Sequence, residues 1–197
     1  ADVVPGLAKG MPEISPDGSR LLFLRTNEDQ DDVYTYDLMV ASRQGADPAS
    51  IVRGESSNDA VGATFVDSPT WSADGQASFY LEMTYRKSML TTRVVRVNTS
   101  GSARLVLASR RVNYKELKYV NGQVRSRDAA LYTGVDASPD GTRLLIDMTS
   151  LFYKSGLASD LVALDLATNR VSMLEKSAGE GSWSPDGSRI AFTSERQ

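Results

Sequence analysis

One four-residue motif occurs four times in this chain and limits the folds that it can adopt. It consists of serine, proline or alanine, aspartate and glycine, and its copies begin at Ser15, Ser72, Ser138 and Ser184, at intervals of 57, 66 and 46 residues. Recurrence at such intervals is typical of solenoids and propellers. Each copy also predicts a tight turn, because proline presets φ, aspartate bonds nearby backbone amides, and glycine accepts a positive φ.

Apolar runs flank these turns and predict short buried strands. The runs that follow the turns are 19–24, 76–81, 142–147 and 188–193, and strands before the turns are clearest at 69–71 and 181–183. Third strands are expected at 33–37, 94–98 and 161–165, and fourth strands at 50–53, 103–107 and 170–174. The third strands end at Asp37, Asn98 and Asp165, whose side chains are suited to capping a turn.

The repeating unit is therefore four antiparallel strands, which is the blade of a β-propeller. We predict an all-β chain that forms one propeller domain over residues 1–197, with about three and a half blades. The spacings exceed the roughly 40–45 residues of a minimal blade, so insertions are expected. The longest is predicted at about 109–134, where Asn121-Gly122 indicates a hairpin.

The predicted insertion is basic, although the chain has a formal net charge of −3. Its basic residues include Arg110 and Arg111. A basic hairpin suits an acidic protein face, a nucleic-acid backbone or anionic lipid. We favour a solvated ribbon whose charges prevent edge pairing, and we expect no nucleic-acid partner because the whole chain is acidic. No apolar run approaches the ~20 residues of a membrane helix, so no membrane insertion is expected.

The segment from Trp183 to Arg196, which reads WSPDGSRIAFTSER, resembles the repeat of the TolB-like propellers, also called WD40-like or PD40 repeats. Residues 27–37 look like the next part of the same repeat. The second copy departs from the pattern at Ala73, and the third at Ala137, where two other copies have tryptophan. The resemblance implies a propeller. Members include periplasmic TolB, secreted proteins of unknown role, and the gating propellers of prolyl oligopeptidases.

The sequence ends at Gln197, which by comparison with this family lies after the second strand of a blade. Because a propeller avoids open sheet edges by closing its ring, three explanations are open. We favour a piece, or the ordered part, of a longer protein. The others are a second chain, such as a homodimer partner, that completes the ring, and a small domain with an irregular closure.

The residue inventory excludes several kinds of catalytic site. There is no histidine and no cysteine, so a Ser-His-Asp triad, a histidine zinc site and thiol chemistry cannot form within these residues. Oligogalacturonate-lyase-like members of the superfamily use histidine-rich metal sites, which this chain cannot supply. Glu13 and Asp136 are predicted to face the channel, where paired carboxylates are compatible with glycoside chemistry. We favour simple polarity of the channel rim for both.

Two further groups are candidates for binding. The acidic run 27–32 offers oxygen ligands for calcium but lacks the glycine and terminal glutamate of an EF-hand, so we favour a solvated loop and expect no metal and no cofactor. Tyr85 and Arg86 are predicted in a loop between second and third strands, and such loops often form partner surfaces. Trp71 and Trp183 are expected to pack between blades.

We predict a non-enzymatic scaffold that binds another protein through loops and the channel mouth, and we expect it in the bacterial cell envelope. The candidate binding residues are Glu13, Tyr85, Arg86, Arg110, Arg111 and Asp136. Ala1-Asp2 suits a mature N-terminus left after cleavage, so a periplasmic or secreted location is expected. The alternative is the propeller portion of a larger hydrolase of the prolyl-oligopeptidase type, and a third option is a carbohydrate-binding or lyase-like activity in the channel.

Overall fold

The computed structural model describes residues 12–28, 34–55, 63–113, 115, 119–120, 123–124, 129–150 and 158–194. Within these residues the structure is built almost entirely from antiparallel strands. The predicted all-β propeller is confirmed, with three four-stranded blades followed by a two-stranded unit.

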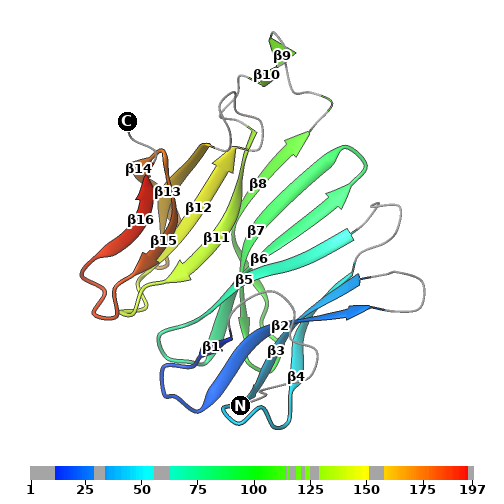
Figure 1. Ribbon diagram of the computed structural model, residues 1–197, viewed down its shortest axis with the longest axis vertical. Coiled ribbons are helices and arrows are strands. Elements are labelled where there is room, and N and C mark those ends of the chain that lie inside the picture. The colour runs from blue at the N-terminus through cyan, green and yellow to red at the C-terminus, as the bar shows by residue number, and fades with distance from the viewer. Residues whose placement is uncertain are drawn as a thin grey trace.

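The blades succeed one another along the chain (Figure 1). Blade 1 consists of β1 (Glu13–Ile14), β2 (Arg20–Glu28), β3 (Tyr34–Ser42) and β4 (Ala49–Glu55), and blade 2 of β5 (Ala63–Trp71), β6 (Ala77–Arg86), β7 (Met89–Asn98) and β8 (Leu105–Asn113). Blade 3 consists of β11 (Ala130–Ala137), β12 (Arg143–Ser150), β13 (Ala158–Asp165) and β14 (Arg170–Lys176), and the last unit of β15 (Ala178–Trp183) and β16 (Ile190–Ser194).

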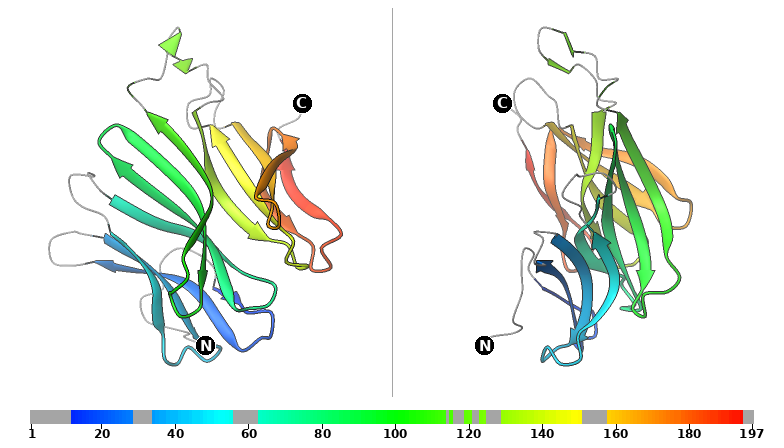
Figure 2. Two further views of the ribbon diagram at one scale, coloured as in Figure 1. Left: turned by 180° about the vertical axis from the view of Figure 1, so that it is seen from behind. Right: turned by 90° about the vertical axis from the view of Figure 1, so that its right-hand side faces the viewer.

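Blades 1 and 2 share one hydrogen-bonded sheet, because β4 pairs with β5 between Glu55 and Thr64. Seen from behind, blade 2 lies between blade 1 and blade 3 (Figure 2, left). A small hairpin of β9 (Tyr119–Val120) and β10 (Gln123–Val124) projects beyond the end of β8 (Figures 1 and 2). Its pairing agrees with the hairpin predicted around Asn121-Gly122, which itself lies outside the described residues.

All four serine–aspartate–glycine motifs form the same turn. In each, the glycine amide donates to the serine carbonyl at 2.8–2.9 Å, and the glycine φ lies between 68° and 72°. The aspartate Oδ1 accepts a 2.6 Å bond from the serine hydroxyl and a further bond from the backbone amide two residues on. These bonds hold the pKa of Asp17, Asp140 and Asp186 at about 2.

The core lies between the blades, because alternate residues of each strand face the two neighbouring blades. Leu22 and Leu38 of blade 1 pack with Trp71 and Tyr80 of blade 2. On the opposite face of blade 2, Phe79 belongs to a cluster with Leu144 and other apolar residues of blade 3. Each blade is thus stabilised mainly by the faces of its neighbours.

Two boundary predictions were wrong. Asp37 does not end a strand, because β3 continues to Ser42. Ser42 pairs with Arg20 at the start of β2, just as Asn98 pairs with Ala77 at the start of β6. Ser42 is therefore the residue of blade 1 that is equivalent to Asn98. Ser42 forms the turn instead, since its carbonyl and hydroxyl accept bonds from the amides of residues 45 and 46. The predicted insertion at 109–134 is also too wide, because β8 extends to residue 113 and β11 begins at residue 130.

Candidate anion-binding pocket

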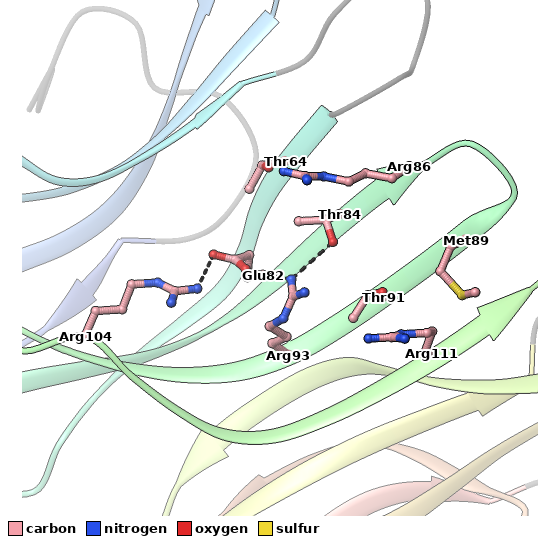
Figure 3. A pocket seen from close by; sticks show the side chains of 9 residues that line it. All are labelled: Thr64, Glu82, Thr84, Arg86, Met89, Thr91, Arg93, Arg104 and Arg111. Carbon is pink, nitrogen blue, oxygen red and sulfur yellow. Dashed lines mark hydrogen bonds and ion pairs between the residues drawn. The ribbon is translucent and has the colours of Figure 1, made fainter.

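An arginine-lined pocket lies on one face of blade 2 (Figure 3). It has a volume of about 530 Å³. It is lined by Thr64, Glu82, Thr84, Arg86, Met89, Thr91, Arg93, Arg104 and Arg111. The strand register explains this set, since Thr64 lies opposite Thr84, Thr84 opposite Thr91, and Thr91 opposite Arg111. A row of three threonines ending in an arginine therefore crosses all four strands.

Glu82 organises the inner part of the pocket. Its Oε1 accepts a 3.0 Å bond from Arg93, and its Oε2 accepts one from Arg104. Arg93 also donates to the Thr84 hydroxyl at 3.1 Å. Since charge-assisted bonds are shorter and stronger than neutral ones, these contacts hold both guanidinium groups in the pocket.

Arg86 and Arg111 form the outer part and are both exposed. Neither has an ion pair or hydrogen bond to another residue in the described parts of the chain. In Figure 3, Arg86 extends its guanidinium toward Thr64, and Arg111 lies beside Thr91. The pocket therefore carries four arginines against one glutamate, and two of its cations are available to an incoming anion.

Two other predicted binding residues lie on the opposite face of blade 2. Tyr85 is half-buried and packs on the cluster that contains Leu90 and Leu131. Arg110 donates from Nε to the carbonyl oxygen of Ala130 at 2.6 Å and so ties β8 to blade 3. The prediction of a shared loop for Tyr85 and Arg86 was wrong, because both end β6 and consecutive strand residues point to opposite faces.

Glu13 and Asp136 line one small cavity of about 210 Å³ at the inner strands. Each carboxylate also joins its blade to the next. Glu13 accepts bonds from the Trp71 amide at 2.9 Å and the Thr70 hydroxyl at 3.1 Å. Asp136 accepts equivalent bonds from the amide of residue 183, at 2.9 Å, and the hydroxyl of residue 182, at 3.1 Å.

Burial raises the pKa of Glu13 to about 7, although the bonds from Trp71 and Thr70 oppose this shift, and the negative charge of Asp136 adds to it. A carboxyl whose pKa is higher in the folded state favours folding when protonated. Its contribution is complete below pH 4.5, the ordinary value, and is lost as the pH rises through 7. We expect the unfolding free energy, measured with urea, to fall between pH 5 and pH 8.

Glu13→Gln should make that pH dependence shallower. Glutamine can still accept from the Trp71 amide, and its NH₂ can donate to Thr70, whose hydroxyl then acts as an acceptor. Burial also raises the pKa of Asp147, so part of the slope should remain. Asp17→Asn is the matched control, because a carboxyl with a pKa of about 2 does not titrate in this range. An equal slope in wild type and Glu13→Gln would contradict the assignment.

The remaining candidates fall partly outside the described residues. This holds for the side chains of the acidic run 27–32. It also holds for three further basic residues of the predicted insertion, Lys118, Arg125 and Arg127. Among the described residues, no group of three or more acidic side chains is placed to hold a metal ion. The same residues include no helix that is long and apolar enough to cross a membrane.

Sequence reasoning missed Glu82, Arg93 and Arg104. A signal for the first two was present, because the β6–β7 hairpin turns at residues 87–88 and so places residue 82 opposite residue 93. Arg104 lies just before β8 and reaches Glu82 across the face of the blade (Figure 3). No pattern in the sequence indicates that contact.

A scan against family models finds no match, and a search of curated proteins finds none either. Solved structures do match. Oligogalacturonate lyase from Vibrio parahaemolyticus is 16% identical with a TM-score of 0.55, over 92% of this chain and 44% of the lyase. Tricorn protease is 12% identical with a TM-score of 0.55, and the match covers 92% of this chain and 20% of the protease. Prolyl oligopeptidase B from Galerina marginata is 16% identical with a TM-score of 0.51, and the match covers 90% of this chain and 24% of that enzyme.

The matched structures are β-propeller domains, which agrees with the blades described above. The chain spans less than half the length of each of these proteins. At these identities the likeness concerns the fold, because one propeller architecture serves many unrelated functions. Function must therefore be argued from the pocket and not from these neighbours.

Proposed function

We propose that this chain is a non-enzymatic propeller scaffold of the TolB-like type, which binds an acidic segment of another protein in the arginine-lined pocket. The observation that carries the proposal is the pair Arg86 and Arg111, two exposed guanidinium groups on one face with no internal counter-ion among the described residues. The lack of histidine excludes a Ser-His-Asp triad within these residues. The resemblance to TolB supports a periplasmic or secreted location.

The pocket chemistry suits carboxylates. A guanidinium presents donors in a planar fork that matches a carboxylate, and the threonine row places hydroxyl groups beside both free arginines. Glu82 already neutralises part of the charge of Arg93 and Arg104, so a partner carboxylate gains most from Arg86 and Arg111. Strands hold these side chains, and sites on regular elements are positioned more firmly than sites on loops.

A hexaglutamate peptide is a suitable probe of this site. We expect wild type to bind it with an affinity that falls as salt is raised, because exposed charges are screened. Arg86→Glu/Arg111→Glu should weaken binding at least about tenfold, which corresponds to 1.4 kcal/mol. Isothermal titration calorimetry at low and physiological salt measures both effects.

Arg170→Glu/Lys176→Glu is the matched control, since both residues are exposed on β14 and the change in net charge is the same. It should bind the peptide within about twofold of wild type if the pocket is the site. An equal loss in this control would mean that overall charge, not the pocket, determines binding. Failure of wild type to bind at low salt would also overturn the proposal.

A second candidate function is the propeller portion of a larger hydrolase. What favours it is that two of the similar structures are proteases by name, and that this chain covers only 20% and 24% of them. The coding sequence of the intact gene tests it. A serine nucleophile and a histidine after residue 197 would support the hydrolase, whereas further serine–aspartate–glycine copies followed by a stop would support the scaffold.

A further inference from the structure

The joint between blades 2 and 3 differs from the other two blade joints. In the joint between blades 1 and 2, Trp71 stands just before the motif serine of blade 2 and packs on Leu22 and Val40 of blade 1. In the joint between blade 3 and β15–β16, Trp183 takes the same place and packs on the cluster that contains Leu145. At the equivalent position of blade 3 stands Ala137.

The joint between blades 2 and 3 also differs in the arginine that stacks on the tryptophan at each of the other joints. The guanidinium carbon of Arg20 lies 5.1 Å from the centre of the Trp71 ring, and that of Arg143 lies 5.6 Å from the Trp183 ring. The residue of blade 2 equivalent to these arginines is Ala77. The joint between blades 2 and 3 therefore lacks both the ring and the cation that stacks on it.

A groove of about 540 Å³ is present at this joint. Phe79, which replaces the leucine of the other joints, fills only part of the space, and Leu105, Leu107 and Ala137 line the rest. Leu105 is 54% exposed, which is high for an apolar side chain in a groove. The volume falls within the 300–1,000 Å³ of typical ligand pockets.

Two cations border the groove. Arg96 lies opposite Phe79 on the neighbouring strand, where the equivalent residues of blades 1 and 3 are Val40 and Ala163. Arg143 lines the other side. Guanidinium groups are attracted to the negative face of an aromatic ring, and Arg20 and Arg143 show that this chain uses such stacking at both neighbouring joints. Asp74 and Asp140 also line the groove, and Arg143 already stacks on Trp183. Arg96 is therefore the cation of the groove that is placed to stack on an additional aromatic ring.

We infer that this groove binds an aromatic side chain of a partner protein, which occupies the place that Trp71 and Trp183 fill in the other joints. The site is separate from the arginine-lined pocket, because Phe79 lies near the start of β6 and Arg86 ends it. Aromatic residues are the commonest anchors in protein interfaces. The groove is suited to such an anchor because its apolar floor is already formed without it.

N-acetyl-tryptophanamide is the probe, and N-acetyl-leucinamide is the non-aromatic comparison. Methyl NMR of the full chain should show that the tryptophan compound shifts Leu105 and Leu107 and binds at least threefold more tightly than the leucine compound. Arg96→Met should weaken the tryptophan compound severalfold, because it removes the cation and keeps an apolar stem. Equal binding of the two compounds, or shifts confined to other residues, would overturn the inference.

Phe79→Leu/Ala137→Trp introduces the leucine and the tryptophan of the joint between blades 1 and 2 into this site. Its melting temperature should equal or exceed that of wild type, because the new ring fills the groove. For the same reason, its affinity for the tryptophan compound should fall at least tenfold. If this variant does not fold, Leu105→Asp at an exposed position gives the same test. Arg86→Glu/Arg111→Glu should bind the probe as wild type does, which separates this site from the arginine pocket. Unchanged binding in the filled variant, or in Leu105→Asp, would refute the assignment.

Discussion

Trp71→Ala should lower the unfolding free energy by about 3–5 kcal/mol, the usual cost of truncating a buried aromatic residue. Trp71 is 4% exposed and lies in the core between blades 1 and 2. Its indole Nε1 donates to the Glu13 carbonyl at 3.1 Å, and Arg20 stacks on its ring. The substitution therefore removes apolar contacts, a hydrogen bond and a cation–π contact from one joint. Urea denaturation followed by circular dichroism measures the change.

Trp183→Ala is the matched comparison, because Trp183 occupies the equivalent position but is only half-buried. Its Nε1 has no hydrogen-bond partner within the described residues. We expect a loss of about half that of Trp71→Ala or less, since less apolar area is removed from the core. Equal losses in the two variants would show that burial between blades 1 and 2 does not determine the contribution of Trp71.

The repeat made the architecture predictable. Each motif copy supplies a turn whose geometry follows from proline, aspartate and glycine, and each apolar run next to it forms a strand of the blade. The predicted packing of Trp71 and Trp183 between blades is confirmed as well. Local chemistry and apolar patterning agree at these positions, which is the condition under which sequence specifies structure.

The candidate site was less predictable, because its residues are joined by strand register and not by sequence neighbourhood. Tyr85 and Arg86 are adjacent in sequence, as are Arg110 and Arg111, yet each pair is divided between the two faces of blade 2. Of these four residues, Arg86 and Arg111 line the pocket, and Tyr85 and Arg110 do not. Alternation along a strand separates such neighbours once the strand boundaries are known, and those boundaries are the least certain part of a prediction.

The groove between blades 2 and 3 shows a different limit. The sequence indicates that Ala137 interrupts the tryptophan pattern, but whether the space closes depends on the neighbouring blade. Phe79 replaces a leucine there and compensates in part. Because the cost and size of a cavity depend on how far its surroundings can collapse, only the packed structure shows that an opening remains.

Asp37→Ala is expected to destabilise the fold by about 3 kcal/mol, because removal of one partner from a buried ion pair leaves an uncompensated charge. Asp37 has no solvent exposure, and its Oδ2 lies 3.1 Å from Arg25 Nη2. Arg53 lies farther away, with Nε 3.7 Å from Oδ1, and is mostly exposed. Because the Arg25 side chain is 33% exposed, water compensates part of the ion pair that Arg25 loses in this variant.

Blade 3 provides the control and explains how the pair can be replaced. Met148 and Asp160 occupy the positions equivalent to Arg25 and Asp37, so the fold accepts an apolar residue in place of the arginine. Arg25→Met/Asp37→Leu should recover most of the stability lost in Asp37→Ala, because well-packed apolar residues replace buried ion pairs at little cost. Asp160→Ala, at a partly exposed position, should cost less than about 1 kcal/mol. If the double variant is as unstable as Asp37→Ala, the loss comes from the missing carboxylate contacts and not from an unpaired Arg25.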